Sequence, residues 1–293
     1  MHIRLMKEKN LQTILDKLID EKKIFGTSFG IKKEAFEWLG ASGNIATHQP
    51  YFIASTTKLF TTVLVLRLIA DGNLKLDAPI SNYLDNSVTC ELHKYKGKDY
   101  SNLLTIKHLL SHTSGLPDYF QDKDVNGSSL EQALLKGRDQ FWTFEQSMER
   151  TKSIQPLFAP GTKNKAHYSD ANFQLLGKII ENITRKTYSE NCRDEITKPL
   201  RMLNTYVYND PTDSTPMPLY YKNKELNIPK AMTSFGADGS IVSTTADLLI
   251  FIEAFFNAKL FPDSYVNALQ VWNNIFFPFR AGIGIHLFKL PWL

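Results

Sequence analysis

The sequence predicts an α+β fold in which helices flank an antiparallel sheet built from both ends of the chain. Strand-like alternation of apolar and polar residues occurs near both ends, at 27–33, 36–40 and 281–289, whereas the middle of the chain has helical periodicity. Because strands and helices are segregated along the sequence, an alternating parallel sheet is disfavoured. We expect a single domain over residues 1–293, with a sheet lobe of about 1–80 and 236–293 and a helical lobe of about 81–235.

The N-terminal elements follow from periodicity. Apolar residues between Leu11 and Ile19 repeat at helical spacing, which is typical of an amphipathic helix. After the two strands at 27–33 and 36–40, the stretch YFIASTTKLFTTVLVLRLIADG (51–72) is apolar almost all round and therefore predicts a buried helix. Gly72 suits the left-handed position that follows a helix end.

The central segment is expected to be mostly helical. A strong helix is predicted over 171–184, and residues 210–218 are rich in turn formers and are expected to form a surface loop. Four threonines precede helical periodicity and are candidate N-caps: Thr105, Thr143, Thr187 and Thr244.

Composition excludes several classes of function. The 293-residue chain has a net charge of +4, and its lysines and arginines form no basic stripe that would indicate a nucleic-acid partner. Cys90 and Cys192 form no C-x-x-C, so neither a zinc motif nor a redox motif is supported. We find no signal peptide and no stretch of ~20 apolar residues. We therefore expect a cytoplasmic protein without a membrane span, a metal or a cofactor.

Ser55 and Lys58 form a Ser-x-x-Lys pattern at the start of the apolar helix. This spacing places both side chains on one face of a helix. Burial is expected to lower the pKa of Lys58, which would help it to take a proton from Ser55. The helix N-terminus would also offer N–H groups to an oxyanion. The structural alternative is that Ser55 is an N-cap and Lys58 a solvated residue of the first turn.

A second serine competes as the nucleophile. Residues 26–30 match the G-x-S-x-G elbow, with Ser28 at the centre. That motif requires a strand before the serine and a helix after it. Since the residues after Gly30 favour a β-hairpin, we expect Ser55 rather than Ser28 to be the nucleophile.

Five segments, in this order, resemble the serine β-lactamase-related hydrolases, which include class C β-lactamases, D-alanyl-D-alanine carboxypeptidases and esterases. The segments are FIASTTKLFT, LTIKHLLSHTSGLPDY, FAPGTKNKAHYSDANFQLLGKIIENIT, EITKPLRML and GADGSIVSTTADLLIF. The resemblance covers nearly the whole chain and implies a β-lactamase/transpeptidase-like fold.

The resemblance also implies three catalytic roles. Ser55 would be the acylated nucleophile, and Lys58 would keep the network polarised and help to deprotonate it. Tyr168 matches the tyrosine of the family's Y-x-N motif. It would carry the proton from Ser55 to the leaving group and then help to activate the deacylating water. The alternative for Tyr168 is a buried aromatic residue before a helix.

Asp170 occupies the third position of that motif, where the family has asparagine. The position implies a substrate-binding residue, but a carboxylate cannot donate to a substrate carbonyl as an amide can. Two alternatives stay open. Asp170 pairs with Lys58 and holds it charged, or it only caps the following helix.

The family's third motif, a K-T-G or H-x-G triplet on a strand facing the nucleophile, has no match. Trp38-Leu-Gly40 resembles it loosely but precedes Ser55. The sequence ends at GIGIHLFKLPWL, where the family continues, so we expect a C-terminal truncation. Loss of that strand would remove one oxyanion donor and weaken catalysis. It would also leave 281–289 as an exposed edge strand through which the chain self-associates.

We therefore expect a serine hydrolase that acts through an acyl-enzyme on an ester, amide or lactam of a small molecule or peptide. The absent strand makes an esterase or D-alanyl-D-alanine peptidase a better expectation than a β-lactamase. The alternative is a catalytically inactive relative that binds a peptide or a cell-wall fragment.

Overall fold

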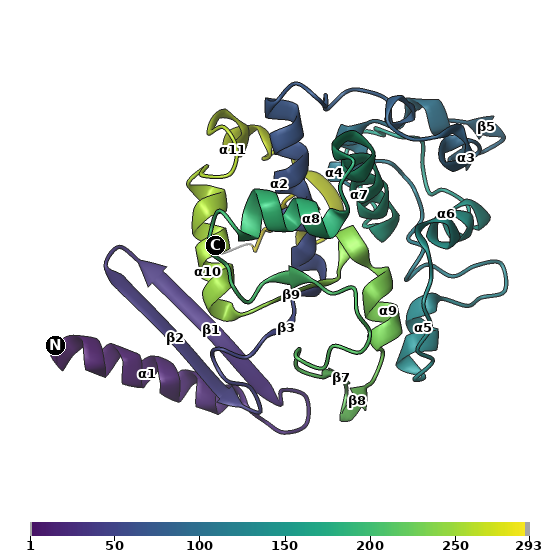
Figure 1. The fold of residues 1–293 in the computed structure, drawn as a ribbon. Coiled ribbons are helices and arrows are strands. Elements are labelled where there is room, and N and C mark those ends of the chain that lie inside the picture. The colour runs from purple at the N-terminus through teal and green to yellow at the C-terminus, as the bar shows by residue number, and fades with distance from the viewer. Residues whose placement is uncertain (1, 291–293) are drawn as a thin grey trace.

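A computed structural model describes residues 2–290, with the backbone alone for residues 2–6 (Figure 1). The structure has the predicted α+β character, with helices at the centre and several small antiparallel sheets around them. Figure 1 shows the N-terminal helix and hairpin on one side of the molecule, beside the C-terminal part of the chain.

The N-terminal hairpin was predicted correctly. Helix α1 (His2–Leu18) packs on β2 (Phe36–Gly43), which pairs with β1 (Gly26–Lys33) in an antiparallel register from Gly26↔Gly43 to Lys33↔Phe36. Strand β1 in turn contacts helix α10 (Thr245–Phe256).

Helix α2 (Thr57–Ala70) lies in the core, as its apolar sequence predicts. A 3₁₀ turn, η1 (Ala54–Thr56), leads into it. Phe60, Val63 and Val65 are fully buried. Helices α7 (Asp170–Thr184) and α8 (Tyr188–Cys192) pack directly against α2, and α4 (Ile106–Leu110) packs against α7. Gly72 has a φ of +75°, which agrees with the predicted helix end.

A three-stranded sheet ties distant segments to the start of α2. Its order is β3 (Tyr51–Phe52), β9 (Ile241–Ser243), β6 (Tyr206–Val207), all antiparallel. The Ile53 N–H donates to the Ile241 carbonyl, and the Ile241 N–H donates to Thr57 Oγ1. These bonds hold the turn η5 (Gly236–Asp238) beside α2.

The predicted helix caps are present, since each of the four threonines accepts a backbone N–H from the residue three positions later. Residues 210–218 contain no regular element, as expected. The remaining elements are η2 (Ile80–Asn82), α3 (Asn86–Thr89), β4 (Lys94–Tyr95), β5 (Lys98–Asp99), η3 (Ser101–Leu103), α5 (Leu130–Leu135), α6 (Phe144–Ser153), the π-helical η4 (Arg193–Thr197), β7 (Leu219–Tyr221), β8 (Lys224–Leu226), α9 (Pro229–Ser234) and α11 (Ser264–Ala268).

The C-terminal prediction was wrong in one respect. Residues 281–289 do not form one strand, because a turn at 282–285 separates β11 (Phe279–Ala281) from β12 (His286–Phe288). Gly284 adopts a φ of +69° there, which reverses the chain. With β10 (Asn273–Phe276) the two strands form a sheet of order β10-β11-β12.

The sheet predicted from both termini is divided into separate sheets. Within residues 2–290, the β1–β2 hairpin pairs with no C-terminal strand and instead packs against α1 and α10. The division into a sheet lobe and a helical lobe stays a prediction. Across the same residues no helix has the length and apolarity needed to cross a bilayer. Both cysteines are free thiols.

Candidate active site

Ser55 lies in the turn η1, immediately before α2, and is exposed. The preceding residue, Ala54, has a φ of +46°, in the left-handed region that a residue with a Cβ adopts at a cost of about 1–3 kcal/mol. The Ser55 hydroxyl makes no capping bond. The N-cap interpretation of Ser55 is therefore wrong, and its Oγ is free to meet side chains from other elements.

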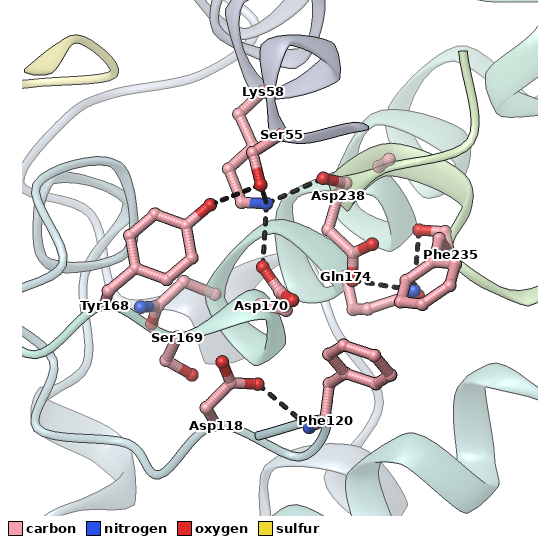
Figure 2. A network of polar contacts seen from close by, with 12 residues as sticks. Ser55, Lys58, Asp118, Phe120, Tyr168, Ser169, Asp170, Gln174, Phe235 and Asp238 are labelled. Atoms are coloured by element: carbon pink, nitrogen blue, oxygen red, sulfur yellow. Dashed lines mark hydrogen bonds and ion pairs between the residues drawn. The ribbon is translucent and has the colours of Figure 1, made fainter. Parts of the chain in front are cut away.

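Lys58 lies one turn after Ser55 and is 3% exposed. Its ammonium has three acceptors from three parts of the chain (Figure 2). Nζ donates to Ser55 Oγ at 3.3 Å and to the Asp238 carbonyl at 2.6 Å, and it lies 2.7 Å from Asp170 Oδ1. Since an ammonium has three donors, all of them are used.

The expected decrease in the pKa of Lys58 does not occur. Burial by itself lowers that pKa, but the Asp170 carboxylate, with contributions from Tyr168 and Asp238, raises it by more. The net pKa of Lys58 lies well above its ordinary value. The prediction considered burial alone, whereas a paired buried lysine stays charged.

Tyr168 precedes α7 and directs its hydroxyl to Ser55. The Tyr168 hydroxyl donates to Ser55 Oγ at 2.7 Å, and Lys58 Nζ lies 5.1 Å from the ring centroid. Burial raises the pKa of Tyr168 above its ordinary value, although the Lys58 ammonium opposes this effect. The tyrosine is therefore a phenol in the resting protein.

Asp170 is the first residue of α7, and Ser169 occupies the N-cap position without a capping bond. The capping alternative for Asp170 is therefore wrong, and the pairing alternative is correct. Asp170 is 8% exposed, and its carboxylate forms the ion pair with Lys58.

Two further carboxyl groups lie near this pair, and Figure 2 shows Asp118 below Asp170 and Asp238 to the right of Lys58. Asp118 and Asp238 are each 1% exposed. Asp118 Oδ1 accepts the Phe120 N–H, and Asp238 Oδ2 accepts bonds from the Tyr119 hydroxyl and from Gln174. Burial and the nearby Asp170 carboxylate raise the pKa of both acids well above the ordinary value. Nothing in the sequence pattern indicated these groups as part of the site.

Two histidines flank Tyr168, and sequence reasoning assigned a role to neither. The His112 ring stacks on Tyr168 with 4.6 Å between centroids, and His286 of β12 lies 5.7 Å from the same ring. His112 Nδ1 accepts the Ser169 N–H, so its proton is on Nε2. Burial and Lys58 lower the pKa of His286 to about 4. Both rings are therefore neutral at neutral pH.

The competing serine is not part of this group. Ser28 lies on β1, where its hydroxyl bonds Thr245 Oγ1 at 2.6 Å, and a second strand rather than a helix follows it. The elbow interpretation is wrong for that reason. Trp38 and Gly40, which resemble the family's third motif loosely, lie on β2 of the same hairpin.

The arrangement of side chains around Ser55 supports nucleophilic chemistry. Within the described residues no group of three or more histidine, cysteine or acidic side chains could hold a metal ion. An exposed hydroxyl is instead contacted by a buried ammonium and a phenol, which come from α2 and from the segment before α7. Such a set can activate Ser55 and carry its proton.

A family model described as Beta-lactamase matches residues 11–287. N-acetylmuramyl-L-alanine amidase of Bacillus subtilis (strain 168) is 30% identical over 208 residues, which cover 68% of this chain and 42% of that protein. Teichoic acid D-alanine hydrolase of Staphylococcus aureus is 27% identical over 228 residues, which cover 75% of this chain and 49% of that protein. The chain spans about half the length of the curated relatives it matches.

Among solved structures, a D-stereospecific amidohydrolase from Streptomyces sp. is similar, with a TM-score of 0.81 and 26% identity. The match covers 97% of this chain and 84% of that chain. This likeness confirms the predicted fold class, and the family match confirms the resemblance drawn from the five sequence segments.

Proposed function

Since the chain belongs to the Beta-lactamase family, we propose that it is a serine hydrolase that cleaves amide or ester bonds of D-alanyl and related D-aminoacyl compounds through an acyl-enzyme on Ser55. The observation that carries this proposal is the convergence of the Tyr168 hydroxyl and the Lys58 ammonium on Ser55 Oγ, at 2.7 Å and 3.3 Å. The names of two similar proteins, an amidase and an amidohydrolase, support the bond type. The names of the D-alanine hydrolase and of the D-stereospecific amidohydrolase support a D-configured acyl group.

Lys58 acts as a fixed positive charge rather than as a base. Its three donors are occupied, and Asp170 keeps it charged. The Lys58 ammonium lowers the free energy of a Tyr168 phenolate and of a negative charge on Ser55 Oγ. The base is therefore Tyr168 in its deprotonated form, which becomes more abundant as pH rises.

Acylation then proceeds through two proton transfers, the first from Ser55 to Tyr168 and the second from Tyr168 to the leaving group. The Tyr168 phenolate takes the Ser55 proton while Oγ attacks the substrate carbonyl carbon and forms a tetrahedral intermediate. The intermediate collapses with cleavage of the bond to the leaving nitrogen or oxygen, which receives the proton from Tyr168. The products are the Ser55 ester and the free amine or alcohol, and Tyr168 is again a phenolate.

Deacylation repeats the sequence with water. The phenolate takes a proton from a water molecule whose oxygen attacks the ester carbonyl carbon. Collapse of the second tetrahedral intermediate breaks the bond to Ser55 Oγ, which takes the proton back from Tyr168. Each turnover consumes one water molecule and releases one acid together with one amine or alcohol.

The function is tested with D-alanine p-nitroanilide, its L-enantiomer and p-nitrophenyl acetate. We expect hydrolysis of the D-anilide and of the acetate, and Ser55→Ala should lower both rates by at least ~10³-fold. Ser28→Ala is the matched control and should retain the wild-type rates. Full activity in Ser55→Ala would contradict the proposal. Wild-type protein without turnover of any of these compounds would instead favour the inactive binding protein.

We also propose that the chain self-associates through β12. This strand is an edge of the β10-β11-β12 sheet within the described residues, and Phe276, Phe277 and Phe288 are 63%, 79% and 65% exposed. Unpaired strand edges favour pairing with another chain. Sedimentation velocity should show a concentration-dependent dimer or larger species that Phe288→Lys abolishes. Phe256→Lys, an equally exposed site on α10, should leave it unchanged, and a monomer at all concentrations would overturn the proposal.

A further inference from the structure

Asp170 has a free acceptor close to the nucleophile. Its carboxylate lies 2.7 Å from Lys58 Nζ, which lies 3.3 Å from Ser55 Oγ. Beyond the Lys58 contact, no hydrogen bond reaches this carboxylate from the part of the chain that the structure describes. Its side chain keeps 11% exposure. Since a carboxylate has two oxygens and only acceptor capacity, it can still accept from a donor group of a ligand.

The surroundings of Asp170 are rich in carboxyl groups and poor in cations. Asp118, Asp170 and Asp238 are all more than nine-tenths buried, and Lys58 is the only lysine or arginine among the buried residues that the structure describes. Asp118 Oδ2 and Asp238 Oδ1 have no hydrogen-bond partner in this part of the chain. Burial raises the pKa of both acids, so they hold protons that a second cation would displace. The cluster is therefore arranged to tolerate an additional positive charge.

The acyl part of an aminoacyl substrate can bring a positive charge close to Asp170. In an aminoacyl substrate attacked by Ser55, the α-nitrogen is only three bonds from Oγ. When the amine is free, that nitrogen is an ammonium with three donors. When the amine is acylated, the group is neutral and also presents a carbonyl oxygen, which a carboxylate repels. Asp170 can therefore distinguish the two kinds of substrate.

We propose that Asp170 binds the α-ammonium group of the substrate, so that the protein hydrolyses D-aminoacyl amides and esters with a free amino group in preference to N-acylated ones. This assignment rests on the proposed hydrolase function and adds a specificity-determining residue to it. A charged hydrogen bond of this kind corresponds to a preference of about 10- to 100-fold.

The test compares D-alanine p-nitroanilide with N-acetyl-D-alanine p-nitroanilide at pH 7, in the wild type and in Asp170→Asn. Both substrates undergo the same reaction, so an effect of the substitution on that reaction changes both kcat/KM values equally. Their ratio therefore reports only the preference for the free amino group. We expect a wild-type ratio of at least ~10, and a decrease of about tenfold or more in Asp170→Asn, mainly through KM. The comparison variant is Asp118→Asn, the same change at a deeper carboxyl, which should lower the ratio less than Asp170→Asn does. An unchanged ratio in Asp170→Asn would overturn the inference.

A binding measurement separates this inference from the hydrolase proposal. Calorimetry with Ser55→Ala protein should show D-alanine amide binding at least ~10-fold more tightly than N-acetyl-D-alanine amide at pH 7. The difference should disappear by pH 10, because an α-ammonium loses its charge near pH 8. Equal affinities would overturn the role of Asp170 even if the enzyme is active. A retained preference without turnover would leave the role of Asp170 standing and count against the hydrolase proposal.

Discussion

At the scale of single residues, the presence of an aspartate at position 170 keeps Lys58 in its charged form. Lys58 is buried, and burial alone would favour its neutral form. The Asp170 carboxylate reverses this preference, and the pKa of Lys58 rises. We therefore propose that proton transfer is carried out by Tyr168, whose hydroxyl contacts Ser55 Oγ.

The pH dependence should report on this assignment. Burial raises the pKa of Tyr168 above its ordinary value, so the phenolate is a minor species at neutral pH. We expect kcat/KM for p-nitrophenyl acetate, corrected with Ser55→Ala, to rise about tenfold per pH unit between pH 7 and 9. Asp170→Asn should move this rise to lower pH, because the Asp170 carboxylate contributes to the raised pKa of Tyr168. A rate that is flat or falls over this range would argue against a tyrosine base.

Lys58 and Tyr168 should behave as one unit. Lys58→Met and Tyr168→Phe should each lower turnover by at least ~10²-fold, the usual contribution of acid–base groups. Because both act on Ser55 Oγ, the double variant should be little worse than either single variant. Thermal unfolding is followed in parallel, since Lys58→Met leaves the buried Asp170 without its cation. Losses that multiply would show that the two side chains act independently.

At the scale of elements, tight turns place side chains of the candidate site. The strained turn at Ala54 presents Ser55, and the turn at 282–285 carries β12 and His286 toward Tyr168. The Gly284 N–H donates to the Leu110 carbonyl, and Thr62 donates to the Gly284 carbonyl. This turn therefore connects the C-terminal sheet to α2 and to the end of α4.

Gly284 is expected to tolerate no side chain. A Cβ there would lie 2.3 Å from the Thr62 side chain, in addition to the cost of a φ of +69°. Gly284→Ala should therefore lower the free energy of unfolding by about 1–3 kcal/mol more than Gly72→Ala does. Gly72 is the matched control, because it has a φ of +75° with nothing within 4 Å of the added Cβ. Urea denaturation measures the free energy of unfolding of both variants. Equal losses in Gly284→Ala and Gly72→Ala would show that the turn is not packed against α2.

At the scale of the whole molecule, the sequence predicted the longer helices, the N-terminal hairpin and the three residues whose side chains meet at Ser55 Oγ. Local signals sufficed for α2, the N-terminal hairpin and the threonine caps, because each depends on neighbours within a few positions. The contacts of Asp238 and His286 with the site depend on segments far from Ser55, and their sequence patterns carry no such signal. The C-terminal strands were mistaken for one because alternation continues through Gly282 and Gly284.

Whether Ser55 is the nucleophile is tested most directly by locating the residue that a fluorophosphonate probe modifies. Trypsin places Ser55 in the peptide 34–58 and Ser28 in the peptide 24–32, so the two candidates separate by mass. We expect one added label, on Ser55 within 34–58, and no label on the Ser55→Ala protein. A label on 24–32, or an unlabelled wild-type protein whose circular dichroism shows a folded chain, would contradict this expectation.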